Sequence, residues 1–391
     1  MKSRFSVILL CIALCAFFAC SSNNGTTGTI DTGVLYIAAQ GDNSLNSYTV
    51  TLGNGALTLL GSAQGTGSSP FAIALSPLLN ALFVDNTASA TVTSYTINGD
   101  GSATANTTAA KTGKMPMGMA IDPFGKFLFV ANQGSSTISV FSINNSTLTE
   151  VAGSPFTTIP AGTTVATGPT SLIVSASGNF LYVSNNFTST ISAYSISGSG
   201  ALTPLGGSPF AAGLAPTGVT VPPSGGFLYV ANTGANSISA FSICDKVVTS
   251  CTDVNHPDGN LTPVTGSPFS DGGSPIAIAI DPAFDFLYVL DSRSNQISSY
   301  SYGTGNGVLT PLSATPTVST GLAPSSFVIV SGTTGSNIGN TLTNPTDFVY
   351  VVNNESSTLS VFSLDTTTGV LTPIGLAAST AVNPTAVAAA N

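Results

Sequence analysis

The chain has 391 residues, of which 42% are apolar and only 6% are charged. Disordered chains combine high charge with low hydrophobicity, so this composition indicates a folded protein. Seven basic residues against sixteen acidic ones give a net charge of −9. That balance argues against nucleic acid as a partner, because such binding needs clustered Lys and Arg. With one His and few charged residues, the chain has few side chains that could act as a general acid or base. We also expect no cofactor and no metal site.

The N-terminus has the pattern of a secretory signal. Lys2 and Arg4 precede an apolar run over residues 5–18, which is shorter than the roughly 20 residues that span a membrane. Cys20 follows Ala19 as the lipidated Cys does in bacterial lipoprotein signals, although Phe17 stands where those signals prefer Leu. The resemblance implies a signal peptide over residues 1–19 and a lipid anchor on Cys20. An ordinary cleaved signal is the alternative.

The segment that follows reads as a polar tether over residues 20–33. The lipoprotein resemblance implies a cell-envelope location, and Ser21 in place of Asp favours the outer membrane of a Gram-negative cell. In this oxidising location Cys244 and Cys251, with six residues between them, are expected to form a disulfide. A metal site with His256 is the alternative, but it lacks a fourth ligand and the usual zinc spacing.

One unit recurs seven times along residues 34–391. A Leu-Tyr-Val type fragment marks each copy, and its central aromatic residues are Tyr36, Phe83, Phe129, Tyr182, Tyr229, Tyr288 and Tyr350. A second aromatic follows each of these by twelve residues, at Tyr48, Tyr95, Phe141, Tyr194, Phe241, Tyr300 and Phe362. The residues around it alternate between apolar and polar, as in half-buried strands, and a polar turn separates the two strands.

Two further signatures complete the unit. A Leu-Thr-Pro strand follows in several copies, at residues 202–204, 261–263, 309–311 and 371–373. A proline then opens an apolar strand, at Pro70, Pro116, Pro169, Pro216, Pro275, Pro324 and Pro384. Four antiparallel strands repeated at this interval predict an all-β, seven-bladed β-propeller of four-stranded blades. A β-solenoid is the competing fold, but its repeats are shorter and its strands are parallel.

The two ends of the repeat region predict how the ring closes. The region begins at Leu35 with the second strand of a blade and finishes with an unpaired first strand over residues 383–388. We expect this C-terminal strand to complete the first blade, which would bury two open strand edges.

The unit resembles the YVTN-type repeats of lactonase-like seven-bladed propellers, as in residues 226–232 (GFLYVAN) followed by residues 236–239 (NSIS). The resemblance implies the propeller fold, and it allows a 6-phosphogluconolactonase-like activity. Catalytic members are expected to place His, Arg and acidic side chains at the central pocket. Here His256 lies inside an insertion, so no catalytic motif transfers residue by residue.

Polar residues in the turns after the Leu-Tyr-Val strands are the candidate ligand-binding set. The candidates are Asp85, Asn132, Asn185, Asn232, Asp291, Arg293, Asn353 and Glu355. Around a channel mouth they could hold a sugar or another neutral polyhydroxylated ligand. As alternatives, the Asn residues form turns with their own backbone, and Asp291 pairs with Arg293. A cation between Asp85, Asp291 and Glu355 has no calcium-loop spacing to support it.

These observations favour a membrane-tethered, non-catalytic, monomeric propeller that binds a partner protein or a glycan. A sugar lactonase is the alternative that the family resemblance supports. A mainly structural surface protein is a third interpretation.

Overall fold

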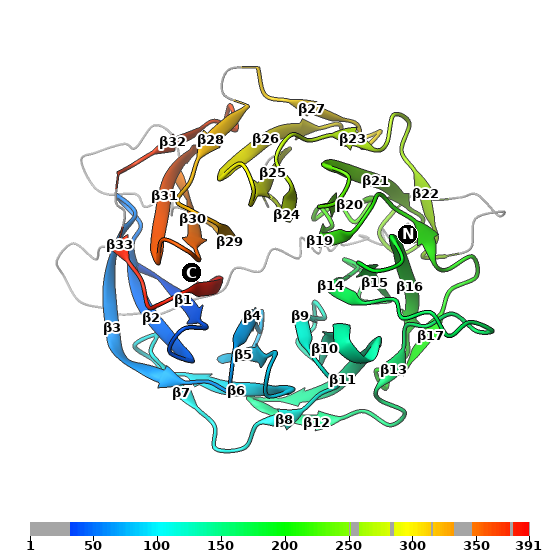
Figure 1. The fold of residues 1–391 in the computed structure, drawn as a ribbon, viewed down its shortest axis with the longest axis horizontal. Coiled ribbons are helices and arrows are strands. Elements are labelled where there is room, and N and C mark those ends of the chain that lie inside the picture. The colour runs from blue at the N-terminus through cyan, green and yellow to red at the C-terminus, as the bar shows by residue number, and fades with distance from the viewer. Residues whose placement is uncertain are drawn as a thin grey trace, which may run out of the picture.

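The computed structural model describes residues 32–249, 251, 258–281, 285–313, 316–331, 346–375 and 378–390. Cys20, His256 and most of the predicted signal and tether lie outside these residues. Seven twisted sheets stand around one axis, with the first strand of each sheet nearest the axis (Figure 1). The chain is therefore a seven-bladed β-propeller, as the repeats predict.

Each blade has an inner strand that begins with the repeated proline. The inner strands are β34 (Pro384–Ala390), β4 (Pro70–Leu75), β9 (Pro116–Ile121), β14 (Pro169–Val174), β19 (Pro216–Thr220), β24 (Pro275–Ile280) and β29 (Pro324–Val330), for blades 1 to 7 in this order. Proline lacks an N–H, and a strand start is where a missing ladder donor does least harm.

The second and third strands of each blade form a hairpin. The second strands are β1 (Thr32–Ala39), β5 (Ala81–Asn86), β10 (Phe127–Asn132), β15 (Phe180–Asn185), β20 (Phe227–Asn232), β25 (Phe286–Asp291) and β30 (Thr346–Asn353). The third strands are β2 (Ser44–Thr51), β6 (Thr91–Ile97), β11 (Thr137–Asn144), β16 (Thr190–Ile196), β21 (Ser237–Ile243), β26 (Gln296–Tyr302) and β31 (Thr358–Asp365). A short 3-10 helix, η1 (Gln133–Ser135), forms the turn of the blade 3 hairpin.

The outer strand is continuous only in blade 1, as β3 (Ala56–Gly65). In the other blades it consists of two short pieces that both pair with the third strand. These pieces are β7 (Ala103–Ala105) and β8 (Ala110–Lys111), β12 (Thr147–Glu150) and β13 (Phe156–Thr157), β17 (Leu202–Pro204) and β18 (Phe210–Ala211), β22 (Leu261–Pro263) and β23 (Phe269–Ser270), β27 (Leu309–Pro311) and β28 (Thr317–Ser319), and β32 (Leu371–Pro373) and β33 (Ala378–Ser379).

In blades 3, 4 and 5 a Gly-Ser-Pro sequence lies at the interruption. The Ser-Pro peptide bond is cis in all three, and the chain leaves the ladder there. The serine hydroxyl replaces the lost backbone acceptor: Ser208 Oγ accepts from the N–H of Ala193 at 2.9 Å, and Ser267 Oγ accepts from the N–H of Ala240 at 2.9 Å. The third strand thereby keeps its donors satisfied across the gap.

The C-terminal strand closes the ring, which confirms the prediction. β34 pairs antiparallel with β1, from Val34 opposite Ala390 to Ala39 opposite Pro384. In Figure 1 the C-terminal strand lies beside β1, between β29 and β4. Blade 1 therefore contains both ends of the propeller, in the order β3-β2-β1-β34.

Seven apolar clusters fill the spaces between neighbouring blades. The cluster across the closure joins Leu35, Ile37 and Val387 of blade 1 to Phe348 and Tyr350 of blade 7. Because the sheets stand on edge around the axis, each one buries both of its faces. The near-continuous apolar second strands follow from this arrangement.

A tyrosine–glycine hydrogen bond links five of the seven pairs of neighbouring blades. The second-strand tyrosine donates to the C=O of a glycine in the turn between the third and outer strands of the next blade. The pairs are Tyr36–Gly101, Tyr182–Gly259, Tyr229–Gly307, Tyr288–Gly369 and Tyr350–Gly55, at 2.8–3.1 Å. All five glycines have positive φ, which few other residues adopt without strain.

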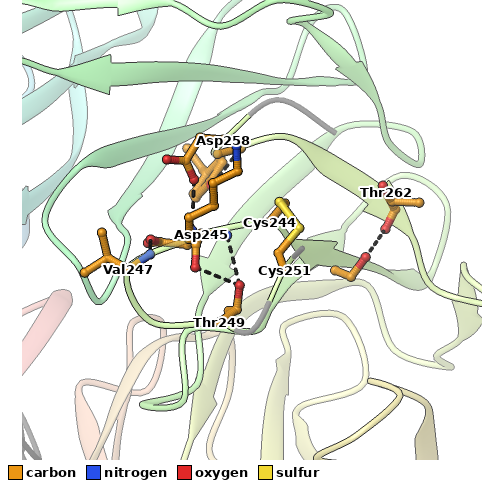
Figure 2. The surroundings of a disulfide bond; sticks show 11 residues. Cys244, Asp245, Val247, Thr249, Cys251, Asp258 and Thr262 are labelled. Carbon is orange, nitrogen blue, oxygen red and sulfur yellow. Dashed lines mark hydrogen bonds between the residues drawn. A yellow bond between two sulfur atoms is a disulfide. The ribbon is translucent and has the colours of Figure 1, made fainter. Parts of the chain in front are cut away.

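The insertion in blade 5 contains the expected disulfide between Cys244 and Cys251 (Figure 2). Within the insertion, Thr249 Oγ1 donates to the C=O of Asp245 at 2.7 Å. The Asp245 carboxylate also accepts from Ser177 Oγ of blade 4 at 2.5 Å. The described part of the insertion is therefore fixed to its own blade and to the neighbouring one. No helix among the described residues is long and apolar enough to cross a membrane.

Candidate functional site

The two faces of the ring are built from different connections. At one face each inner strand begins at its proline and each hairpin makes its turn; we call it the proline face. The pairing of Asn132 with both Pro116 and Thr137 places these connections together. The opposite face carries the turns from inner to second strand and from third to outer strand. The predicted ligand-binding residues lie at the ends of second strands or, for Arg293 and Glu355, in the turns that follow them, so they belong to the proline face.

The predicted asparagines form a clamp inside the blades. Each side-chain amide donates at 2.8–3.2 Å to two hydroxyls of the third strand: Asn86 to Thr91 and Thr93, Asn132 to Thr137 and Ser139, Asn185 to Thr190 and Ser192, Asn232 to Ser237 and Ser239, and Asn353 to Thr358 and Ser360. In blades 2, 5 and 7 the amide oxygen accepts from the N–H of Gly67, Gly213 or Gly321, in the loop that enters the same blade.

These contacts determine what the asparagines can do. Asn132, Asn185, Asn232 and Asn353 are fully buried. A ligand at the proline face would have to displace the overlying loop to reach them. Their bonds run to the next strand and, where the oxygen is used, to the entering loop. The clamp thus fixes each hairpin and, in blades 2, 5 and 7, the loop above it.

Asp85 lies one residue before the clamp position of blade 2 and is fully buried. Its Oδ1 accepts from the N–H of Ala72, at the irregular start of the inner strand, at 2.6 Å. Its Oδ2 is buried without a hydrogen-bond partner. Burial raises the pKa of this carboxyl from 3.8 to about 7, against the lowering effect of the inner-strand amides. Asp85 therefore supports the inner strand from inside the blade.

Asp291 occupies the clamp position of blade 6 and is also fully buried, whereas Arg293 and Glu355 are exposed on their turns. No ion pair joins Asp291 to Arg293, both of which the structure describes. Arg293 is fixed through its backbone, by a 3.3 Å bond from its N–H to the C=O of Gly273. In the described part of the chain, no group of three or more His, Cys, Asp or Glu side chains could hold a metal ion.

The inner strands contain no ionisable side chain. All seven consist of apolar residues, Gly, Pro, Ser and Thr. Inner strands supply the side chains nearest the axis of a propeller. The general acid and base that hydrolysis of a lactone would use would therefore have to come from outside these strands.

An incomplete ring of exposed apolar side chains is the main feature of the proline face. We call it the apolar collar and define it as Val382 in blade 1, Phe71 in blade 2, Met115 in blade 3, Val165 and Phe187 in blade 4, Leu214 in blade 5 and Leu322 in blade 7. These side chains are 37–61% exposed. Blade 6 contributes no member. It places Gly273 and Arg293 at the corresponding part of the face, so the collar has one polar sector.

Collar residues lie directly on glycines of the proline face. A Cβ added to Gly41 would lie 2.6 Å from Val382, one on Gly168 would lie 2.5 Å from Phe187, and one on Gly234 would lie 3.0 Å from Leu214. The glycines make room for these apolar side chains, whose outer surfaces remain in solvent. Sequence reasoning missed the collar. The available signal was the apolar residue two positions before the proline in blades 1, 5 and 7.

The ring, its closure and its repeats define a propeller of the lactonase type. The family model for the seven-bladed β-propeller lactonases matches residues 26–110, 95–153, 147–247 and 215–323. The chain therefore belongs to this family. No curated protein sequence matches it.

Solved structures share the fold at low sequence identity. The "putative 6-phosphogluconolactonase" of Bacteroides uniformis superposes with a TM-score of 0.74 at 16% identity, covering 92% of this chain and 99% of that one. The periplasmic gluconolactonase PpgL of Pseudomonas aeruginosa superposes with a TM-score of 0.71 at 17% identity, covering 92% and 99%. At these identities the likeness establishes the fold alone.

Proposed function

We propose that this propeller is a non-catalytic binding protein and that its apolar collar docks a partner protein. The collar is the observation that carries the proposal. Seven apolar side chains from six blades are exposed on the proline face, and apolar surface gathered on one face is typical of protein interaction sites. Met, Phe and Arg are enriched in protein interfaces, and this face combines all three.

The chemistry of the collar favours a protein over a glycan. The Asn side chains that could have bound sugar hydroxyls are committed to the internal clamp. The exposed side chains on this face include the apolar collar and a few charged groups, among them Lys114, Arg293 and Glu355. The opposite face exposes carboxylates, among them Asp100, Asp285 and Asp365, beside apolar side chains such as Leu78 and Phe124. A partner with an apolar centre and an acidic group opposite Arg293 would complement the collar.

Attachment through Cys20 would direct the collar outward. Thr32, at the start of β1, pairs with Thr51 at the end of β2, so the chain enters the propeller at the opposite face. A lipid anchor on Cys20 would hold that face toward the membrane and present the collar to the periplasm or the exterior. Replacing Cys20 with Ser should release the protein from the membrane fraction, and unchanged fractionation would exclude the anchor.

The docking proposal is tested by comparing one collar variant with one variant of the opposite face. The double substitution Leu214→Asp/Leu322→Asp puts charge into the collar. Leu78→Asp does the same at the opposite face, where Leu78 is 65% exposed. Soluble protein starting at Ser21 is cross-linked to envelope extract, and the captured protein is then purified and titrated. We expect at least about tenfold weaker binding by the collar variant, the size of a hot-spot loss, and unchanged binding by Leu78→Asp. Equal binding by both variants, or capture of glycans alone, would refute the proposal.

Lactone hydrolysis is the second candidate, because the family and the periplasmic gluconolactonase of P. aeruginosa point to it. The exposed turn residues Arg293 and Glu355 are the side chains on which it could depend. Hydrolysis of gluconolactone or 6-phosphogluconolactone above the spontaneous rate, abolished by replacing Arg293 or Glu355, would establish it. Turnover equal to the spontaneous rate would leave the binding role.

A further inference from the structure

Blade 6 differs from the other blades at two buried positions, the clamp position and a position in the loop before the inner strand. Asp291 stands where five other blades have a clamp Asn, and it has no amide to donate. Asp271 stands four residues before the inner-strand proline, where blades 2, 3, 7 and 1 have Thr66, Thr112, Thr320 and Thr380. Both aspartates are buried. Two carboxyl groups thus replace two neutral side chains in the polar sector of the collar.

Hydrogen bonds fix one side of each carboxyl group. Tyr300 donates to Oδ1 of Asp271 at 2.7 Å, and Ser298 donates to Oδ2 of Asp291 at 2.6 Å. Oδ1 of Asp291 is buried and has no hydrogen-bond donor. A buried carboxylate oxygen without a donor is costly, and the cost disappears if a proton lies between the two acids. The Asp271 carboxyl raises the pKa of Asp291 in addition to the effect of burial, which is the larger cause.

The loop over residues 271–274 is fixed through this pair. The N–H of Gly273 donates to Oδ2 of Asp271 at 3.4 Å, and a Cβ on Gly273 would lie 2.3 Å from Asp291. The N–H of Asp271 donates to the C=O of Asn236 in blade 5 at 2.9 Å, and the C=O of Gly273 accepts from Arg293. The loop therefore joins blades 5 and 6 and positions the backbone of Arg293.

The ionisable groups around the pair are few. Within blade 6 they are Tyr300 on β26 and Arg293 on the hairpin turn. Burial, followed by the charge of Asp271, raises the pKa of Tyr300, so its hydroxyl stays protonated and remains a donor. The contacts from blade 5 come from the backbone of Asn236 and Thr233 and are neutral. All the Lys and Arg side chains that the structure describes are exposed, so none of them lies buried against the pair.

We propose that Asp271 and Asp291 share one proton, and that this proton latches the loop over residues 271–274 against blade 6. Rising pH loosens the latch and frees the polar sector of the collar around Arg293. The latch itself does not depend on the proposed docking function; only its consequence for a partner does.

The direction of the pH effect follows from linkage. A released loop would expose Asp291 and return its pKa to the ordinary 3.8. Between that value and the raised pKa of the closed state, the closed loop holds one more proton than the open loop. The opening constant therefore rises about tenfold per pH unit across this window and levels off above it. Acid conditions tighten the loop, and alkaline conditions release it.

Asp291→Asn tests the latch, because it restores the residue of the other clamps. Asn232→Asp is the matched control: it creates the same exchange in blade 5, where Ala212 stands in place of the second aspartate. Asp85 also titrates in this range, so the infrared comparison is made in an Asp85→Ser background. Spectra between pH 5 and 9 should show a protonated carboxyl in that background that titrates well above 3.8 and disappears when Asp291→Asn is added. Hydrogen exchange of the peptide containing residues 271–274, corrected for intrinsic rates, should rise with pH in the wild type and stay level in Asp291→Asn.

Three results would overturn the proposal. One is the same protonated-carboxyl band in the Asp85→Ser background with and without Asp291→Asn. Another is an exchange profile for the loop that does not differ between wild type, Asp291→Asn and Asn232→Asp. The third is strong protection of the loop by added calcium, which would identify the pair as cation ligands. None of these measurements uses a partner. They can therefore refute the latch while the docking proposal stands, and the docking experiment can refute docking while the latch stands.

Discussion

At the scale of single residues, buried carboxyl groups are the most unusual feature of a chain with so few charges. Asp85 accepts a hydrogen bond from an inner-strand N–H, a role that a neutral residue has in another blade. Blade 4 has Ser184 at the equivalent position, and its hydroxyl accepts from the inner-strand N–H of Ser171 at 3.1 Å, as Asp85 does from Ala72. A neutral hydroxyl can therefore perform the same structural task without placing a charge in the interior.

Asp85→Ser should accordingly stabilise the protein at alkaline pH and not at acid pH. Burial raises the folded-state pKa of Asp85 to about 7 from 3.8, so the wild type loses stability as pH rises between these values. At 1.36 kcal/mol per pKa unit, the loss by pH 8 is on the order of 2–4 kcal/mol. Urea unfolding at pH 4 and pH 8 measures it. A variant whose pH dependence matches that of the wild type would show that Asp85 does not titrate in this range.

At the scale of elements, the tyrosine–glycine bonds explain why the repeat contains both residues. Each of these buried tyrosines donates a hydrogen bond to the C=O of a glycine in the next blade. The glycine has the positive φ of a left-handed turn. Blades 2 and 3 have Phe83 and Phe129 at this position and lack the bond, although other hydrogen bonds, such as that from Thr87 Oγ1 to the C=O of Pro116, still join blades 2 and 3. The bond is therefore an addition to the packing between blades.

Tyr229→Phe should lower stability by about 1 kcal/mol, the usual net worth of one hydrogen bond. For a domain of this size the melting temperature should fall by about 1–3 °C. Tyr48→Phe is the control, since its hydroxyl bonds to no described residue. Tyr182→Phe and Tyr350→Phe act at separate interfaces, so their losses should add. Loss of folding in Tyr229→Phe would mean that the bond is required for the ring to form.

Sequence patterns predicted the elements well because strand periodicity and the twelve-residue spacing repeat in every blade. They did not predict that most of the candidate binding residues are buried, and the reason is physical. Asn232 reads as a surface turn residue, because the loop that covers it enters 19 residues earlier at Gly213. Collar residues were invisible as a set because Met115, Phe187 and Leu322 occupy different positions in their repeats. Only the ring brings them to one face.

At the scale of the whole molecule, stability depends on a closed ring with no free inner edge. β34 supplies the inner strand of blade 1 and contacts both β29 and β4. Thr385 Oγ1 donates to the C=O of Pro70 at 2.8 Å, 315 residues away in sequence. The C-terminal strand thus holds blade 1 to blade 2 as well as to blade 7.

Deleting residues 383–391 should therefore open the ring. The deletion removes Val387 from the cluster across the closure and exposes the edge of β1. Several small apolar side chains at about 25 cal/mol per Å² amount to several kcal/mol, against total stabilities of about 5–15 kcal/mol. The truncated protein should melt at a much lower temperature and aggregate through the free edge. Deleting residues 21–31 is the control for loss of a terminus and should leave melting unchanged, because β1 begins at Thr32. Equal melting of the two truncated proteins, with both soluble, would show that closure by β34 does not stabilise the ring.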